Sequence, residues 1–574
     1  MKKPLLSEMT LREKIGQMLA PMHFDVYGKP EATFDYSQSN MDEVKALYRK
    51  EQFGVIRGEQ VGVFFSDPEN GGKPEIIEDR DEGLRLAACK VKVKAAPYKK
   101  FIEKHNTYGK VPLLVGGDFT IGGSYYFEDS SLMVNANAIA AADSEELTFE
   151  LGAAIARQMR CTGHNWKWSP PVDLSNRNNT LCMRTFAIDD IDCTIRHAKA
   201  YIDGIQSEGV AACVKHFPSV GREEARDGHF SCQVNMGSLE TWWSEQGKVY
   251  KEVLDGGVYS VMTSHAAFPA VDDRMINGRY VPSTISKKVI TDLLKGELGF
   301  KGVVSTDGIG MAALFTILPY EELVIEIVNA GNDIILGAKL PTGDIIEAAV
   351  KDGRISEERI DDACQRILDM KEKIGLFDES YYDIPYTMAE AVADTDRISA
   401  EIAKRSITVI RDNNKLLPLD KKNIKKVSVI ISTHADGFVS EIEELKKAFN
   451  ERGIEVFMKR RLDNGFELEG IAENSDLIIY AADVHQHGPA GYLRLYGDEA
   501  YTYYHAFKFG KEKSLGVSFG YPYVHYDIME GAPTFLNAYN PRKETMEAFV
   551  QAILGEIPIV GKSPVLITPR ANTR

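Results

Sequence analysis

Short apolar runs recur through the first two-thirds of the chain, and each run ends in small or polar residues. The runs cover Val111–Val115, Trp166–Trp168, Val210–Val214, Val258–Met262, Gly302–Val304 and Asp333–Leu336. Amphipathic stretches, such as Glu145–Arg160 and Thr194–Gln206, separate them. Because apolar runs that alternate with helices are typical of strands buried on both faces, the pattern predicts a parallel sheet in an α/β fold.

Polar side chains follow several of these predicted strands at the point where each strand ends. They are Asp118, Asp173, Lys215, His216, His265 and Asp307. A (β/α) barrel keeps its active site at the carboxyl ends of its strands. A doubly wound open sheet would also place its ligand there, but no G-x-G-x-x-G follows the early strands. The pattern therefore favours a TIM-like (β/α)8 barrel.

The pattern changes after Leu368. Residues from Leu376 to about Ile398 combine aromatics, acids and a proline without clear periodicity, which is typical of a linker. A second α/β unit follows, with strands expected at Val427–Ile431, Leu477–Tyr480 and Leu515–Phe519. We predict a barrel domain over residues 1–378, a linker over 379–400 and a smaller α/β sandwich domain over 401–574.

Composition excludes some classes of partner. The formal charge of −16 argues against a nucleic-acid surface, where basic patches supply most of the affinity. Seven cysteines, an odd number, do not make a disulfide framework, and their spacing gives only a weak case for zinc. We therefore predict no metal and no other cofactor.

The N-terminal segment is predicted to be a helix of the folded domain. Thr10 and Glu13 have the spacing of a capping box, and Leu11, Ile15 and Met18 fall on one helical face. No apolar region of signal-peptide length follows the two N-terminal lysines, and no apolar run is long enough for a membrane span. We expect a cytoplasmic protein.

Two motifs carry a resemblance to a known family. Lys215-His-Phe-Pro218 and Phe300-Lys-Gly-Val-Val-Ser-Thr-Asp-Gly-Ile-Gly-Met311 together resemble glycoside hydrolase family 3. Four further segments resemble family landmarks in the expected order, namely Met9–Met18, Trp168–Asp173, Phe519–Tyr523 and Leu554–Pro558. The resemblance spans most of the chain. It implies a retaining glycosidase that acts on a carbohydrate through a covalent glycosyl–enzyme intermediate.

The resemblance also implies a role for each matching residue. Asp307 matches the nucleophile, and an ionised carboxylate suits that role because it can attack the anomeric carbon and later leave. Lys215, His216 and Arg184 match residues that hydrogen-bond the sugar hydroxyls, and Asp118 matches the carboxylate that grips the far hydroxyls of the same sugar.

Two further strand-end residues have less specific assignments. His265 is a candidate wall residue of the sugar site. An equal alternative is a buried histidine whose ring nitrogens are hydrogen-bonded within the protein. Asp173 is expected to be a structural partner of the residues that touch the sugar.

The acid/base is expected on the loop after Lys215-His-Phe-Pro218. Most family members use a glutamate of the second domain, whereas a branch that acts on N-acetylglucosaminides uses a histidine held by an aspartate two residues earlier. Asp227 and His229 stand at the position of that dyad. An imidazole suits the role because it exchanges protons near neutral pH and a carboxylate fixes its tautomer. Glu499 is the alternative acid/base.

The sequence also departs from the pattern of that branch. Ser219-Val220-Gly221 stands where the branch has Gly-His-Gly, and Ala-Ile-Asp-Asp follows the Arg184 motif in place of Gly-Glu-Asp-Pro. The leading hypothesis is an exo-acting β-N-acetylhexosaminidase working on small glycosides or cell-wall fragments. The alternatives are a β-glucosidase-type hydrolase, a β-N-acetylglucosaminide phosphorylase and a catalytically silent carbohydrate-binding relative.

The second domain has two unassigned polar regions. His485 and His487 make a weak candidate metal pair because no third ligand is visible. The aromatic stretch Tyr496–Tyr504 could stack on an aglycone sugar or form the interface of a homo-oligomer.

Overall fold

A computed structural model of the protein describes residues 2–21, 45–47, 49–57, 94–119, 127–434, 436–462, 464–484 and 493–567. The chain forms two compact units. The first unit comprises Met1–Leu132, Phe149–Ser175 and Ala198–Thr395. The second comprises Met133–Thr148, Asn176–His197 and Asp396–Arg574.

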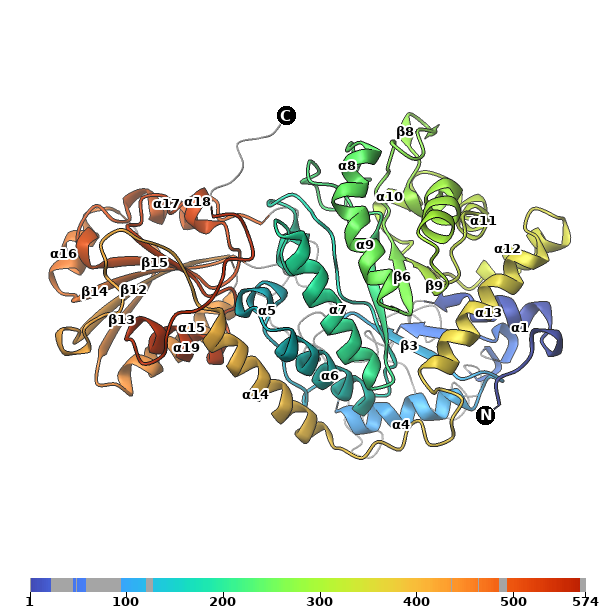
Figure 1. The fold of residues 1–574 in the computed structure, drawn as a ribbon, viewed down its shortest axis with the longest axis horizontal. Helices are drawn as coiled ribbons and strands as arrows, with labels where there is room; N and C mark the ends of the chain where they lie inside the picture. The colour runs from blue at the N-terminus through green and yellow to red at the C-terminus, as the bar shows by residue number, and fades with distance from the viewer. Residues whose placement is uncertain are drawn as a thin grey trace. The chain divides into compact units, whose positions relative to one another are not determined.

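The first unit is built on a barrel of parallel strands (Figure 1). One sheet has the order β2 (Val55–Arg57), β3 (Leu114–Gly117), β4 (Trp166–Lys167), β5 (Ala211–Phe217), β6 (Ser260–Thr263) and β9 (Val303–Thr306). A second pair joins β1 (Leu19–Pro21) to β10 (Ile335–Ala338). A parallel bridge between Ser305 and Ile334 links β9 to β10, and β1 lies beside β2. Within the described residues eight strands close the predicted TIM-like barrel.

Helices surround this barrel between its strands (Figure 1). They are α1 (Leu11–Gln17), α4 (Ala95–Asn106), α6 (Glu145–Cys161), α7 (Ile191–Ser207), α8 (Leu239–Ser244), α9 (Gln246–Asp255), the π-helix η7 (Lys288–Glu297), α10 (Ala312–Phe315), α11 (Tyr320–Ala330), α12 (Thr342–Lys351) and α13 (Glu357–Lys373). The short 3-10 turns are η1 (Leu6–Glu8) and η6 (Ser283–Ile285), and β7 (Met275–Ile276) pairs with β8 (Arg279–Tyr280) as a hairpin. No helix of the described part of the chain is long and apolar enough to cross a membrane.

The predicted N-terminal helix is confirmed with its cap. The Thr10 side chain accepts a hydrogen bond from the Glu13 N–H, and the Glu13 carboxylate accepts one from the Thr10 N–H at 2.8 Å. This reciprocal pair satisfies two backbone donors that the first helical turn leaves open, so the sequence there fixes where α1 starts.

The expected irregular linker is wrong over much of its length, because α14 spans Met388–Ser406. Its buried positions recur at helical spacing, but several carry small residues: Ala391, Thr395, Ile398, Ser399, Ile402, Ala403 and Ser406. Small and hydroxyl-bearing side chains on the buried face hide the hydrophobic periodicity that a sequence pattern relies on. The chain passes from the first unit to the second within this helix.

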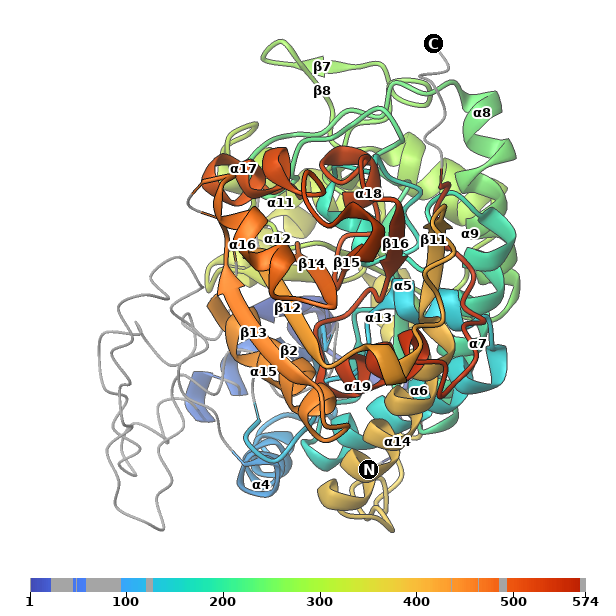
Figure 2. The same ribbon diagram turned by 90° about the vertical axis from the view of Figure 1, so that its left-hand side faces the viewer.

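The second unit is an α/β sandwich around a mixed sheet (Figure 2). The strand order is β11 (Thr408–Asp412), β16 (Thr534–Asn537), β15 (Ser514–Ser518), β14 (Leu477–Asp483), β12 (Lys426–Thr433) and β13 (Glu455–Arg460), and only the β11–β16 pair of the sheet is antiparallel. The three strands expected from the sequence correspond to β12, β14 and β15. The predicted second α/β domain is therefore confirmed.

Two hydrophobic clusters cover the two faces of this sheet. One contains residues of α15 (Asp436–Asn450) and α19 (Lys543–Ile553), and the other contains residues of α16 (Glu467–Glu473), α17 (Gly497–His505) and α18 (Val524–Asp527). The unit also includes α5 (Ala136–Ala142) and the 3-10 turns η5 (Thr180–Met183), η8 (Lys421–Asn423) and η9 (Lys511–Lys513). Because both faces of this mostly parallel sheet are covered, a ligand is expected at the carboxyl ends of its parallel strands.

Candidate active site

Asp307 stands directly after β9, at the carboxyl edge of the barrel. Its N–H donates to the Thr263 carbonyl at 3.2 Å, and its Oδ1 accepts from the Gly308 N–H at 2.6 Å. The side chain remains 29% exposed. The backbone therefore fixes one carboxylate oxygen while the group as a whole stays accessible to a substrate.

Basic side chains from β5 lie near this carboxylate. His216 Nε2 lies 3.8 Å from Asp307 Oδ2, and His216 Nδ1 bonds the buried Asp173 Oδ2 at 2.9 Å. Lys215 forms an ion pair with Asp118 at the end of β3. Neighbouring residues of a regular strand point to opposite faces, but the β5–β6 register shifts between Lys215 and Phe217. This irregularity brings both consecutive side chains to one site.

The surroundings of Asp307 keep its carboxylate ionised. Burial alone would raise its pKa, but the charges of His216, His265 and Lys215 and the Gly308 N–H outweigh burial and lower the pKa to about 2. An ionised carboxylate at neutral pH is the form that a nucleophile at an anomeric carbon requires.

Asp227 and His229 form the predicted dyad. His229 Nδ1 lies 2.6 Å from Asp227 Oδ1, and the same oxygen accepts the His229 N–H at 2.9 Å. The Asp227 side chain is 2% exposed whereas that of His229 is 39% exposed. The buried carboxylate thus orients a ring that reaches solvent.

The dyad loop lies against the loop that carries Asp307. A Cβ added to Gly228 would come within 3.8 Å of Met311 Cε, four residues after Asp307, and within 2.7 Å of Gln233 Oε1. His229 is also near enough to His265 to act on it electrostatically. Both observations place the dyad near the loop of the nucleophile.

The altered part of this loop keeps the backbone shape that its usual glycine would allow. Ser219 has φ of +88°, in the left-handed region that glycine adopts more easily than serine. Its hydroxyl is buried and has no hydrogen-bond partner among the described residues. The serine therefore occupies a strained position without a compensating contact there.

His265 is buried and bonded within the protein. Its Nδ1 lies 2.7 Å from Thr284 Oγ1, and its Nε2 lies 3.0 Å from the Gly308 carbonyl, which can only accept. Burial lowers the pKa of His265 more than the Asp307 charge and the Gly308 carbonyl raise it. The geometry matches the alternative of a satisfied buried histidine that holds the nucleophile loop.

Lys167 is a functional candidate that the sequence pattern missed. It is fully buried in β4, and its ammonium donates to the carbonyls of Asp118 at 3.0 Å and Phe119 at 2.6 Å. It therefore holds the backbone of the residue whose carboxylate pairs with Lys215. The available signal was a lysine between two tryptophans in an apolar run, because a buried ammonium needs acceptors.

The other predicted residues lie in the second unit or outside the described part. Arg184 caps η5, and its buried Nε has no hydrogen-bond partner among the described residues. The Glu499 carboxylate accepts the Thr433 N–H at 3.1 Å and lies 3.4 Å from Arg460 Nε. His485 and His487 are outside the residues that the structure describes.

Residues 10–370 match the family model described as the glycosyl hydrolase family 3 N terminal domain. That match covers more than half of the chain and includes every barrel residue discussed above. The chain belongs to glycosyl hydrolase family 3. It is a carbohydrate-active enzyme of the glycosidase class, as the motif resemblance predicted.

Two relatives with curated names are similar to this chain. A protein of Cellulomonas fimi named beta-N-acetylglucosaminidase/beta-glucosidase is 29% identical over 88% of this chain and 93% of its own length. A beta-hexosaminidase of Xylella fastidiosa (strain M23) is 30% identical over 40% of this chain and 62% of its own.

Solved structures share the two-domain fold of the family. A beta-glucoside phosphorylase, BglX, bound to 2FGlc has a TM-score of 0.78 and 25% identity, covering 98% of this chain and 95% of that one. A family 3 beta-N-acetylglucosaminidase from Paenibacillus sp. str. FPU-7 has a TM-score of 0.73 and 23% identity, covering 98% and 99%. At that last identity the likeness concerns the fold alone.

Proposed function

We propose that this enzyme is a retaining, exo-acting β-N-acetylhexosaminidase that removes terminal β-linked N-acetylglucosamine from small glycosides or cell-wall fragments. The observation that carries the proposal is the Asp227–His229 pair, with its 2.6 Å contact, on a loop that packs near the loop of Asp307. The names of the Cellulomonas fimi and Xylella fastidiosa relatives support the same substrate class.

In the first step Asp307 attacks the anomeric carbon while the glycosidic C–O bond breaks. His229 Nε2 gives its proton to the departing oxygen, and Asp227 stabilises the ring through Nδ1. Asp307 is ionised because its pKa is about 2, so Asp307 and His229 together supply one anion and one proton donor.

In the second step water attacks the anomeric carbon of the glycosyl–enzyme. His229 Nε2 takes a proton from that water, the Asp307–carbon bond breaks, and the sugar leaves with its original anomeric configuration. Asp118, Lys215 and His216 are proposed to hydrogen-bond the sugar hydroxyls, and the role of Arg184, which lies in the second unit, stays a prediction from the family motif. We propose that His265 positions Gly308 and thereby the nucleophile, in place of a direct contact with the sugar.

An aryl-glycoside panel tests the assignment. The enzyme should release aryl alcohol from aryl N-acetyl-β-glucosaminide faster than from aryl β-glucoside. A clear preference for the glucoside would replace the proposal with the β-glucosidase-type alternative, in which Glu499 is the candidate acid/base.

Phosphorolysis is the second candidate function. A histidine acid/base carries no negative charge when neutral, so it does not repel a phosphate that attacks in place of water. The structural likeness to a β-glucoside phosphorylase supports this candidate. Release of sugar 1-phosphate that depends on added phosphate would identify it, and equal rates with and without phosphate would favour hydrolysis.

A cytoplasmic location and assembly into a homo-oligomer are further proposals. Cell fractionation and light scattering of the purified chain test them separately from the reaction.

A further inference from the structure

The second unit contains a cavity of about 220 Å³ at the carboxyl edge of its sheet. Its walls include Val484, after β14, and Tyr521, after the parallel neighbour β15. The Tyr521 N–H donates to the Val484 carbonyl at 2.7 Å, so the backbone joins these two walls. Parallel α/β sheets bind ligands in crevices at this edge.

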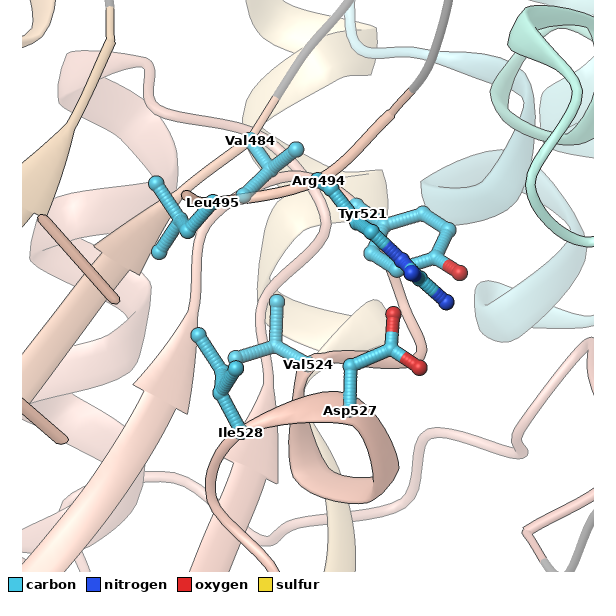
Figure 3. A pocket seen from close by; sticks show the side chains of 7 residues that line it. All are labelled: Val484, Arg494, Leu495, Tyr521, Val524, Asp527 and Ile528. Atoms are coloured by element: carbon cyan, nitrogen blue, oxygen red, sulfur yellow. The ribbon is translucent and has the colours of Figure 1, made fainter. Parts of the chain in front are cut away.

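The cavity has two chemically different sides (Figure 3). Leu495, Val524 and Ile528 supply apolar surface. Across from them, the Tyr521 hydroxyl, the Arg494 guanidinium and the Asp527 carboxylate gather on the other side, as Figure 3 shows. A ligand that fits must therefore have an apolar face and a polar edge.

The buried polar atoms on this side lack ordinary hydrogen-bond partners within the described part of the protein. Tyr521 is 1% exposed, and its hydroxyl interacts with the Asp527 carboxylate, but among the described residues it has no partner within ordinary hydrogen-bond distance and angle. The Asp527 Oδ2 is also buried and, within the same residues, has no such partner. Burial raises the Asp527 pKa more than the charges of Arg177 and Arg494 and the Tyr521 hydroxyl lower it. Buried polar atoms without partners are uncommon in proteins and indicate a missing donor or acceptor.

The mixture of donors and acceptors selects the ligand class. A simple anion would satisfy Arg494 but would face the Asp527 carboxylate, and a hydrocarbon would offer no hydrogen bond to the buried Tyr521 hydroxyl or to Asp527 Oδ2. Hydroxyl groups both donate and accept, so several of them on one ligand can satisfy all three. A pyranose ring combines such hydroxyls at its edge with an apolar C–H face, and the cavity is smaller than the 300 Å³ or more that larger ligands need.

We propose that this cavity binds one neutral pyranose, with its hydroxyls on Tyr521, Arg494 and Asp527 and its C–H face on Leu495, Val524 and Ile528. The site belongs to the second unit and does not require the barrel residues to have the catalytic roles proposed above.

Hydrogen exchange and calorimetry together test the proposal on the full chain. N-acetylglucosamine and glucose are titrated separately into the full chain and into the Lys215→Ala variant, which removes the ammonium that pairs with Asp118 in the barrel. At least one of the sugars should slow amide exchange over residues 521–528. Asp527→Asn and Tyr521→Phe, each added to Lys215→Ala, should weaken that binding about tenfold or more.

Asp498→Asn is the matched control, because this carboxylate of the same unit is 85% exposed and does not line the cavity. It should leave the sugar affinity unchanged. Sugar binding without protection of residues 521–528, or equal loss in Asp498→Asn and Asp527→Asn, would overturn the proposal. Protection by inorganic phosphate but by neither sugar would overturn it in favour of an anion site. Glycosidase activity is measured separately, so a failure of the barrel chemistry is distinguishable from a failure here.

Discussion

Asp307 and Asp527 are both carboxylates near the carboxyl edge of a parallel sheet, yet their surroundings move their pKa values in opposite directions. In the barrel, basic side chains and a backbone N–H outweigh burial and lower the Asp307 pKa to about 2. In the second unit, burial outweighs two arginines and raises the Asp527 pKa. A carboxylate whose negative charge is balanced by nearby groups, as at Asp307, is ready to react without a ligand. A buried carboxylate whose charge is not balanced, as at Asp527, needs a ligand that hydrogen-bonds to it.

Asp307→Asn is the largest test of the compensated site. The amide cannot form the glycosyl–enzyme, so kcat/KM for an aryl glycoside should fall on the order of 10⁴-fold or more. Because the Asp307 pKa of about 2 lies below the working range, the acid limb of the wild-type pH–rate profile should not reflect this group. A variant that keeps a tenth of wild-type activity would exclude Asp307 as the nucleophile.

His229→Ala tests the other half of that site. Proton donation matters most for poor leaving groups, so turnover of alkyl or sugar aglycones should fall roughly 10²- to 10⁴-fold. Turnover of activated aryl glycosides should fall much less in the glycosylation step. Kinetics on both substrate classes check this, with Met236→Ala, at an exposed position a few residues later, as the control. Equal losses on both classes would argue against the acid role.

The placement of the candidate residues in the barrel was largely predictable because its signal is local. Asp118, Lys215, His216 and Asp307 each follow an apolar run, and parallel strands bring their carboxyl ends to one edge. Asp227 and His229 are two residues apart, so one turn suffices to join them. In each case the residue and the feature that fixes its position, an apolar strand or a two-residue spacing, lie in the same short stretch of sequence.

The remaining features depend on contacts that no short stretch encodes. Lys167 bonds two carbonyls nearly fifty residues earlier in the chain, which its own segment cannot reveal. The cavity of the second unit combines residues from 484 to 528 that meet only after the sheet assembles. Helix α14 was missed because small buried residues resemble a linker. Tertiary packing decides all three, so the sequence pattern stops short of them.

Lys167→Met tests whether a buried cation positions the barrel site without touching substrate. Loss of its two hydrogen bonds should let the Asp118 backbone shift, and misplacement of this size costs roughly 10- to 100-fold in kcat/KM. If Asp118 hydrogen-bonds the sugar, KM should change more than kcat. Lys199→Met, a more exposed lysine of α7, is the control. A fall in thermal stability with unchanged KM would assign Lys167 a purely structural role.

Asp527→Asn gives the smallest effect and contrasts the two carboxylates directly. The raised Asp527 pKa means that its ionised form costs stability at neutral pH, and this cost disappears as pH falls below the unfolded value of about 3.9. The variant should therefore be the more stable chain at pH 7 and lose that advantage in acid. Asp307 has the opposite sign, since its stabilisation is present above about pH 4 and is lost as pH falls towards 2.

The four tryptophans all lie in the first unit, so their fluorescence follows the barrel, and hydrogen exchange at β15 and β16 follows the second unit. If Asp527→Asn loosens the second unit at pH 7, the carboxylate is already compensated within the protein, and the contrast between the two sites fails together with the case for a sugar in the cavity.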